Sequence, residues 1–323
     1  MANAFEIPDK IKFNIPDSKK LYDVIIIGAG PAGMTATVYC ARKKLDILLI
    51  SKDIGGQIIW TSSIENYMGY QYIQGSELSD KFILQLVQFP ITMLQATAVC
   101  NLAEDGGNFR IKCGDNDYSS KAVIIATGKK TRQLGVPGER EFFGKGVAYC
   151  SVCDAPFFKN RTVAVIGGGN SALTAAIDIL SYASKMYLIN IADSMQGDPV
   201  LFERVENSGK VEIILSSKVK EIKGDIVVRG IVLENTRTGA VSEIEVGGVF
   251  VEIGLIPNSD FVKNLLLLNE NGEIVIDSNS RTSVDGIFAC GDVTDVLDKQ
   301  IIIACGEGAK AALSVNRYVL AKR

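Results

Sequence analysis

The chain has 323 residues, with 34 Lys and Arg against 37 Asp and Glu, seven Cys and no His, so its formal net charge is −3. Without His, the chain can form no Ser-His-Asp triad, no Cys-His nucleophile pair, no His-ligated zinc and no haem held by a proximal His. The near-neutral charge predicts no nucleic-acid partner, because nucleic-acid binding needs a concentrated basic face. The length corresponds to roughly two domains.

The N-terminal region gives no sign of a targeting or membrane segment. The first twenty residues contain acidic and basic side chains but no apolar run, which predicts no secretory signal. Residues 24–41 form an uncharged stretch of 18 residues, close to membrane-spanning length. Glycines and Pro31 interrupt this stretch, so a strand, a tight turn and a buried helix explain it better. We expect a cytoplasmic protein without a membrane segment.

A first Gly-rich turn follows the apolar run at residues 22–27, which is typical of a fully buried parallel strand. The turn reads Gly28-Ala29-Gly30-Pro31-Ala32-Gly33 and leads into a helical stretch to Arg42 and a strand at residues 46–50. This order is the context that a dinucleotide-binding turn requires. Gly28 allows the tight turn, Gly30 lets a pyrophosphate approach the backbone, and Gly33 lets the helix pack closely. The helix N-terminus favours the phosphates.

A second unit repeats this pattern. A strand at residues 162–166 leads into the GxGxxA turn Gly167-Gly168-Gly169-Asn170-Ser171-Ala172, then a helix at 171–182 and a strand at 186–189. Both units continue with turn-rich β segments and close on apolar segments at residues 122–128 and 249–254. The alternative is that these glycines only form tight turns and bind no nucleotide. Two copies in this context predict an α/β protein with two Rossmann-like, three-layer ββα nucleotide-binding domains.

Two Pro- and Gly-containing segments, residues 131–138 and 254–258, are the candidate domain boundaries. They indicate that the chain leaves the first domain, builds the second and returns to finish the first. The domains expected are an N-terminal extension at 1–20, a discontinuous first domain at 21–132 and 257–323, and a second domain at 133–256.

Between the two units lies Cys150-Ser151-Val152-Cys153-Asp154, a CxxC motif. A zinc site needs two further ligands, but the other five cysteines stand alone and His is absent, so no metal site is expected. The spacing favours a reversible disulfide over coincidence. The apolar flank that follows predicts a raised pKa for Asp154, as a general acid needs, with a helix N-cap as the alternative role. The five isolated cysteines are expected to be small buried side chains.

In order and spacing, the motifs resemble those of the low-molecular-weight thioredoxin reductases over residues 22–318. They are the first Gly-rich turn, Gly55-Gly56-Gln57, Glu65-Asn66-Tyr67, Ala126-Thr127-Gly128, the CxxC-Asp motif, the second Gly-rich turn, Gly291-Asp292-Val293 and Lys299-Gln300-Ile301.

This resemblance implies that the discontinuous first domain binds FAD. It implies that Cys153 faces the flavin, that Cys150 attacks the disulfide of a thioredoxin or glutaredoxin-like protein, and that Asp154 donates a proton. A homodimer is implied as well. The implied FAD-binding residues are Gly28, Gly30, Pro31, Ala32, Gly33, Gly55, Gly56, Gln57, Asn66, Thr127, Gly128, Gly291, Asp292, Lys299, Gln300 and Ile301.

The second unit departs from the family where its members bind the 2′-phosphate of NADPH through a His-Arg-Arg cluster and a further Arg. Here Asn190-Ile191-Ala192-Asp193-Ser194-Met195-Gln196 follows the strand, and no Lys or Arg stands between Met186 and Glu203. Asp193 is displaced from the place where an acidic residue would bind the ribose of NAD. In the helix, Leu173-Thr174-Ala175-Ala176 replaces the usual Glu pair. A donor other than NADPH is therefore expected. The resemblance to relatives that take electrons from reduced ferredoxin or a deazaflavin implies a donor of that kind.

Two other functions fit the same motifs. A flavin-dependent dithiol oxidase would pass electrons from a small dithiol to oxygen without a pyridine nucleotide, and oxygen consumption would reveal it. A flavin-binding redox sensor would show no turnover of a protein disulfide. Asp154 directly after the second Cys favours the reductase.

Overall fold

The computed structural model describes residues 13–60, 64 and 66–322. Contacts divide the described chain into unit 1, which runs up to Lys130 and resumes at Pro257, and unit 2, Thr131–Ile256. The first boundary lies at 130/131 rather than at the expected 132/133. Two short strands, β7 (Lys129–Thr131) and β16 (Leu255–Pro257), pair where the chain passes between the units. Most of the expected N-terminal extension, residues 1–12, lies outside the described residues.

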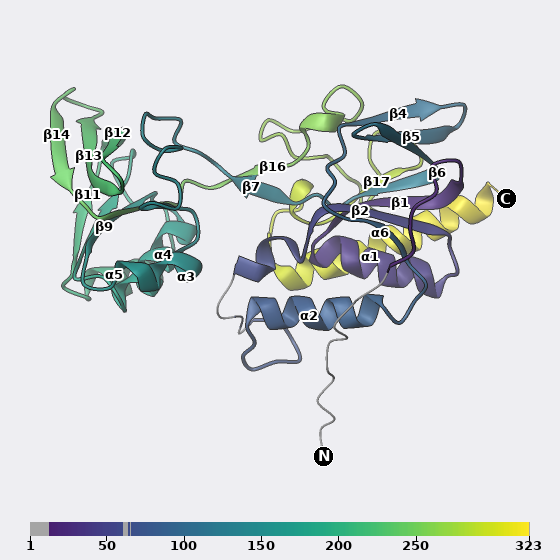
Figure 1. Ribbon diagram of the computed structural model, residues 1–323, viewed down its shortest axis with the longest axis horizontal. Helices are drawn as coiled ribbons and strands as arrows, with labels where there is room; N and C mark the ends of the chain where they lie inside the picture. Colours follow the sequence, from purple (N-terminus) through teal and green to yellow (C-terminus); the bar gives the residue numbers. More distant parts are fainter. Residues whose placement is uncertain (1–12, 61–63, 65, 323) are drawn as a thin grey trace, which may run out of the picture. The chain divides into compact units, whose positions relative to one another are not determined.

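Unit 1 is built on a seven-stranded sheet with the order β3-β2-β1-β6-β5-β4, in which β17 also pairs with β6 (Figure 1). β1, β2, β3, β6 and β17 run parallel, whereas β4 and β5 form an antiparallel extension of β6. The strands are β1 (Leu21–Ala29), β2 (Ile47–Ile54), β3 (Thr92–Leu94), β4 (Asn101–Asp105), β5 (Asn108–Cys113), β6 (Asn116–Ile125) and β17 (Ile287–Ala289).

Alternate residues at positions 24–27 of β1 face two separate cores, which explains why this part of the strand is continuously apolar. Val24 and Ile26 face a core shared with α1 and α6, while Ile25 and Ile27 face a core shared with β5 and residues 262–293. In Figure 1 α1, α2 and α6 gather on one face of the sheet. The helical elements are α1 (Pro31–Arg42), α2 (Gly75–Leu86), α6 (Ile301–Ala321), η1 (Gly56–Trp60), η3 (Asp260–Val262) and η4 (Gly291–Val293).

Unit 2 has a parallel sheet of five strands in the order β11-β10-β9-β15-β8 and a separate antiparallel sheet of three strands. One core lies between the parallel sheet and α4 and α5, and a second lies between the two sheets. The strands are β8 (Val147–Ala148), β9 (Thr162–Ile166), β10 (Lys185–Ile189), β11 (Val211–Ile214), β12 (Ser217–Gly224), β13 (Val228–Asn235), β14 (Val241–Glu245) and β15 (Gly248–Val251). The helical elements are α3 (Ser151–Asp154), η2 (Ala155–Phe158), α4 (Asn170–Leu180) and α5 (Pro199–Glu206).

The predicted α/β fold is confirmed: each unit is a layered, largely parallel sheet, with its Gly-rich turn directly after the central strand β1 or β9. The expected closing segments end earlier than predicted, at Ile125 in β6 and Val251 in β15. In β6 the strand also begins earlier, at Asn116, because it continues into the hairpin with β5. Among the described helices, none is long and apolar enough to cross a membrane.

Candidate functional site

The first Gly-rich turn has the shape that a bound pyrophosphate requires. Gly28 has φ +108°, and a Cβ atom there would collide with the carbonyl group of Ala126. A Cβ atom on Gly33 would collide with the carbonyl group of Gly28. Nothing lies within 4 Å of the corresponding position on Gly30. The outer glycines thus close the turn, and the middle one leaves an open approach at the N-terminus of α1, which fits the diphosphate of FAD.

The segment after β2 completes this turn. The Gly55 amide donates a hydrogen bond of 2.8 Å to the carbonyl oxygen of Ala29, and Ser51 Oγ accepts one of 3.0 Å from the Ala29 amide. A Cβ atom on Gly56 would lie 3.2 Å from Gly30 Cα. The structure therefore brings the predicted Gly55 and Gly56 directly against the first turn.

Other predicted cofactor residues meet although they are distant in sequence. Asn66 Nδ2 donates a hydrogen bond of 3.1 Å to Gln300 Oε1. Gln57 Nε2 donates one of 3.1 Å to the carbonyl oxygen of Lys129. Both contacts lie within unit 1: one joins η1 to β7, and the other joins the loop after η1 to the start of α6.

Thr127 and Gly128 are held by a residue that the sequence analysis missed. Thr127 Oγ1 donates a 2.8 Å hydrogen bond to the carbonyl oxygen of Asn258, and Asn258 Nδ2 donates one of 2.9 Å to the carbonyl oxygen of Thr127. The Asn258 amide also donates to the carbonyl oxygen of Gly128. The remaining predicted residues lie at element starts: Pro31 and Ala32 open α1, Gly291 opens η4 with φ +74°, and Ile301 opens α6.

Asp292 and Lys299 belong to a cluster of charges in unit 1. Burial raises the pKa of Asp292, and the positive charges of Lys299 and Lys129 partly offset that rise. Lys129 and Lys299 both contact Glu273, at 2.9 and 3.0 Å. No motif marks Lys129 or Glu273 in the sequence, because each is a single charged residue in a separate segment.

The CxxC motif of unit 2 lies at α3. Cys150 is disulfide-bonded and half-buried. The side chain of Cys153 is not among those that the structure describes, so its pairing stays a prediction. Asp154 is half-buried, and burial raises its pKa. It stands before η2 but its side chain makes no capping hydrogen bond, which argues against the N-cap role.

The expected burial of the isolated cysteines is wrong for one of them. Cys40, Cys113, Cys290 and Cys305 are free and buried, whereas Cys100 is free and exposed. Cys100 precedes β4, which is the edge strand of its sheet among the described strands.

Two more carboxylates of unit 2, Asp178 and Glu252, lie near the CxxC motif, and no sequence pattern predicted them. Ser151, inside the CxxC sequence, donates a hydrogen bond of 3.1 Å to Asp178 Oδ2 on α4. Burial raises the pKa of Glu252 to about 7, and the neighbouring Asp178 adds to the rise, although a hydrogen bond with Ser171 opposes it. Burial also raises the pKa of Asp178.

The second Gly-rich turn repeats the geometry of the first. Gly167 has φ +144°, and a Cβ atom there would collide with the carbonyl group of Glu252, while nothing lies within 4 Å of that position on Gly169. The Gln196 amide donates a 2.8 Å hydrogen bond to the carbonyl oxygen of Gly168, as Gly55 does to Ala29 in unit 1. The backbone scaffold for a nucleotide is thus retained.

The side chains at the end of β10 are engaged with one another. Asn190 Nδ2 donates hydrogen bonds to the Ser194 carbonyl oxygen at 2.7 Å and to Gln196 Oε1 at 3.1 Å. Asp193 Oδ2 lies 2.6 Å from Arg237 Nη2, in the turn between β13 and β14. No sequence motif marks Arg237, because it is distant along the chain, and its charge is paired with Asp193.

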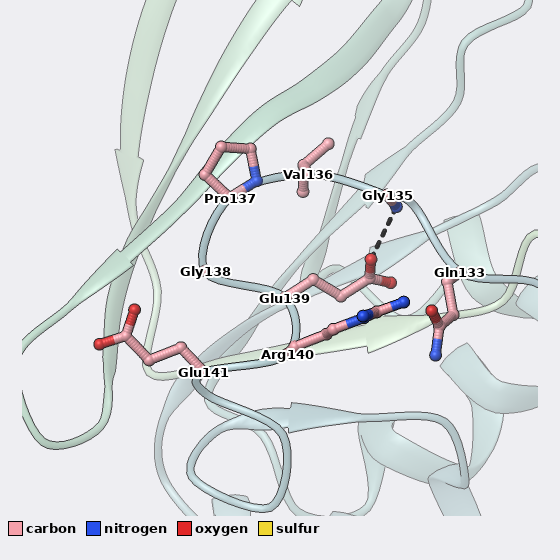
Figure 2. A pocket seen from close by; sticks show the side chains of 8 residues that line it. All are labelled: Gln133, Gly135, Val136, Pro137, Gly138, Glu139, Arg140 and Glu141. Carbon is pink, nitrogen blue, oxygen red and sulfur yellow. Dashed lines mark hydrogen bonds between the residues drawn. The ribbon is translucent and has the colours of Figure 1, made fainter.

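A cavity of about 520 Å³ lies elsewhere in unit 2 and contains none of the predicted site residues (Figure 2). It is lined by Gln133, Gly135, Val136, Pro137, Gly138, Glu139, Arg140 and Glu141. In Figure 2 the Glu139 side chain turns toward the Gly135 amide, which donates a 2.7 Å hydrogen bond to Glu139 Oε2. The cavity therefore belongs to a turn stabilised by an internal carboxylate.

Comparison with known proteins agrees with this arrangement. The family model described as pyridine nucleotide-disulphide oxidoreductase matches residues 22–308. An alkyl hydroperoxide reductase subunit of Staphylococcus epidermidis is 41% identical over 97% of this chain, which spans only 61% of that relative's length. The thioredoxin reductase of Lactococcus lactis has a TM-score of 0.86 at 38% identity, covering 93% of this chain and 99% of that one. The thioredoxin reductase of T. acidophilum has a TM-score of 0.82 at 38% identity, covering 92% and 98%.

The match extends over nearly all of both units and includes both Gly-rich turns and the CxxC motif. The open approach at Gly30, with Gly55 and Gly56 packed against the same turn, fits the cofactor of these flavoproteins. The chain belongs to the pyridine nucleotide-disulphide oxidoreductases, and within them it is a thioredoxin reductase-like flavoenzyme whose cofactor is FAD.

Proposed function

We propose that this chain is a disulfide reductase that passes electrons from FAD through Cys150 and Cys153 to a thioredoxin or a glutaredoxin-like protein. The observation that carries the proposal is a disulfide-bonded Cys150 next to α3, the short helix that ends on the half-buried Asp154. The thioredoxin reductases with the same fold support this class of acceptor. Phe157, close to the motif, has 75% of its surface exposed, which suits a protein partner.

We infer that FAD lies along the first Gly-rich turn, with the diphosphate at Gly30 and the N-terminus of α1. The residues of unit 1 that would hold the flavin are Gln57, Asn66, Thr127, Asp292, Lys299 and Gln300. When bound, FAD supplies the hydride chemistry that no side chain of this chain can supply.

The residues of the motif then transfer the electrons by thiol–disulfide exchange. Two electrons and two protons convert the Cys150–Cys153 disulfide to two thiols. The Cys150 thiolate attacks one sulfur of the partner's disulfide, forming a mixed disulfide and releasing one partner thiolate. Cys153 attacks Cys150, restores the internal disulfide and releases the second partner thiolate. Asp154, whose pKa burial raises, holds a proton for a leaving thiolate.

The proposed donor is reduced ferredoxin or another reductant that is not NADPH. Unit 2 keeps the backbone of a nucleotide-binding turn, but the loop after β10 carries no Lys or Arg, and the nearby Arg237 is paired with Asp193. A 2′-phosphate carries about two negative charges and is bound in such sites by Arg. Without that partner, NADPH loses the interaction that would select it.

A single-turnover experiment tests the disulfide reductase proposal without knowledge of the donor. Holoprotein reduced with dithionite and freed of excess reagent is mixed anaerobically with oxidised thioredoxin. We expect thioredoxin thiols to form and Cys150→Ser to abolish them. Cys100→Ser, which changes the exposed isolated cysteine, should leave them unchanged.

Two results would contradict the proposal. Steady oxygen consumption with dithiothreitol, without transfer to thioredoxin, would indicate the dithiol oxidase. Transfer only to a peroxide-reducing protein would indicate an acceptor like that implied by the name of the staphylococcal relative. We also propose a homodimer, for which light scattering should give twice the 34.8 kDa chain mass.

A further inference from the structure

A cluster of charges around the buried Glu273 joins three separate segments of unit 1. Glu273 Oε1 lies 2.9 Å from Lys129 Nζ and 3.0 Å from Lys299 Nζ. Glu273 Oε2 accepts a 2.8 Å hydrogen bond from Asn269 Nδ2. The side chains of Glu273 and Lys129 are only 11% and 13% exposed, so water screens their charges weakly. Two ammonium groups therefore share one carboxylate where an isolated charge is costly.

The cluster lies beside residues that the proposed FAD site uses. Lys299 is one of them, and its ammonium group also donates a 2.5 Å hydrogen bond to the carbonyl oxygen of Thr294. The carbonyl oxygen of Lys129 accepts the hydrogen bond from Gln57. Both ammonium groups act electrostatically on Asp292. Lys129 thus neighbours three residues assigned to the cofactor, although no sequence motif includes it.

The side chains of Lys129, Lys299 and Glu273 together carry one net positive charge at neutral pH, not counting Asp292, on which both lysines act. Burial alone would raise the pKa of Glu273, but hydrogen bonds from Asn269, Lys129 and Lys299 outweigh burial and hold the pKa at about 2. The carboxylate is therefore ionised and offsets one of the two lysines. The remaining positive charge stabilises negative charge that develops nearby in a poorly screened place.

We propose that Lys129, held by Glu273 beside Lys299, is a further cofactor-tuning residue, and that the positive charge of this cluster favours the reduced state of FAD. This inference rests on the FAD site described under the proposed function. Reduction at neutral pH adds two electrons to the flavin but fewer than two protons, so the ring gains negative charge. Charges beside the ring are a principal means by which a protein adjusts flavin reduction.

The direction in which each substitution shifts the flavin midpoint potential distinguishes two roles of the cluster. If the cluster tunes the flavin, the shift follows the sign of the charge removed. If it only holds Lys129, Lys299 and the turn at Glu273 together, the shift does not depend on that sign. The measurement is the anaerobic midpoint potential of the full-length holoprotein, read from flavin absorbance against a reference dye. Lys129→Met and Lys299→Met each remove one positive charge and keep much of the apolar stem. Each should lower the ratio of reduced to oxidised flavin at a fixed potential roughly tenfold, which is about 30 mV for two electrons.

Glu273→Gln removes the negative charge and should raise the same ratio by a similar factor. Lys130→Met is the matched control, because Lys130 is the next residue of β7, has a side chain 56% exposed and lies 3.8 Å from Asp260. It should leave the potential unchanged, since solvent screens its charge. Lys129→Arg preserves the charge and should also keep the wild-type potential.

Opposite shifts for Lys129→Met and Glu273→Gln support the proposal. Shifts in the same direction, or no shift in either variant, would overturn it. If Lys129→Met does not retain FAD, the same comparison is made between Lys299→Met and Glu273→Gln. Failure of the proposed function is distinguishable, because it appears in the wild type as missing FAD or as no transfer to a protein disulfide.

Discussion

The phenol of Tyr149 donates a hydrogen bond of 2.6 Å to Glu139 Oε1, and Tyr149 directly precedes Cys150. The same carboxylate accepts hydrogen bonds of 2.7 Å from the backbone amides of Leu134 and Gly135. Glu139 is 1% exposed. It therefore joins the segment where the chain enters unit 2 to the flank of the redox motif.

Tyr149→Phe should lower the free energy of unfolding by about 1–2 kcal/mol, because it removes one hydrogen bond to a charged group. Glu139 would keep its two amide donors, so the loss stays moderate. Glu139→Gln should cost more, about 3 kcal/mol, because its amide NH2 would face another donor. Urea unfolding of the full chain measures both values. Tyr182→Phe, at an exposed tyrosine, is the control, and a Tyr149→Phe variant as stable as wild type would contradict this role.

Gly28 and Gly30 should respond differently to substitution. Gly28→Ala should destabilise unit 1 by more than about 2 kcal/mol, because φ is +108° and the Cβ atom meets the Ala126 carbonyl group. Gly30→Val should fold normally, because φ is −80° and no atom lies within 4 Å of its Cβ position. Its side chain would cover the open approach, so we expect FAD content to fall at least about tenfold.

The flavin absorbance per chain and the thermal midpoint of the apoprotein measure these two effects. Gly169→Val is the matched control, since Gly169 has the same open position in unit 2 and φ −95°. It should retain FAD. A Gly30→Val holoprotein with a full complement of FAD would contradict the assigned cofactor site.

Glu252 should make unit 2 less stable as the pH rises. Its pKa is 4.5 in the unfolded chain and about 7 in the folded one, so the folded state binds more protons between these values. The contribution of Glu252 to stability is therefore largest below about pH 4.5, falls as the pH rises to about 7 and then levels off. The loss is at most about 3 kcal/mol.

Glu252→Gln should remove this pH dependence and be more stable than wild type at pH 8. Thermal midpoints of both proteins between pH 5 and pH 8 measure the effect. Glu243→Gln on the exposed β14 strand serves as the control. Parallel pH profiles for wild type and Glu252→Gln would show that this carboxylate does not titrate as expected.

Local patterns predicted the fold well, and several residues that they singled out contact one another in unit 1. Apolar runs followed by glycines place β1, β9 and their turns, because a buried parallel strand and a positive φ each restrict the residue type strongly. Motifs such as Gly55-Gly56-Gln57 follow one another along the chain in the same order and at the same spacing as in the thioredoxin reductases. Their assignment to the cofactor site could therefore be predicted, although their individual contacts could not.

Contacts between single residues of distant segments could not be predicted in this way. Lys129 and Glu273 are ordinary charged residues until the fold brings them together. Arg237 likewise reaches Asp193 only because the β13–β14 turn lies beside the end of β10. Cys100 was misjudged because residue type indicates average burial and does not identify an edge strand.

The central claim is that a thioredoxin reductase-like flavoenzyme has kept a nucleotide-binding turn but does not take its electrons from NADPH. The most direct measurement is an anaerobic titration of the holoprotein with NADPH, NADH and reduced ferredoxin, followed at the flavin absorbance. We expect reduced ferredoxin to bleach the flavin and NADPH to leave it oxidised, with oxidised thioredoxin restoring the absorbance through Cys150. Rapid bleaching by micromolar NADPH would contradict the claim.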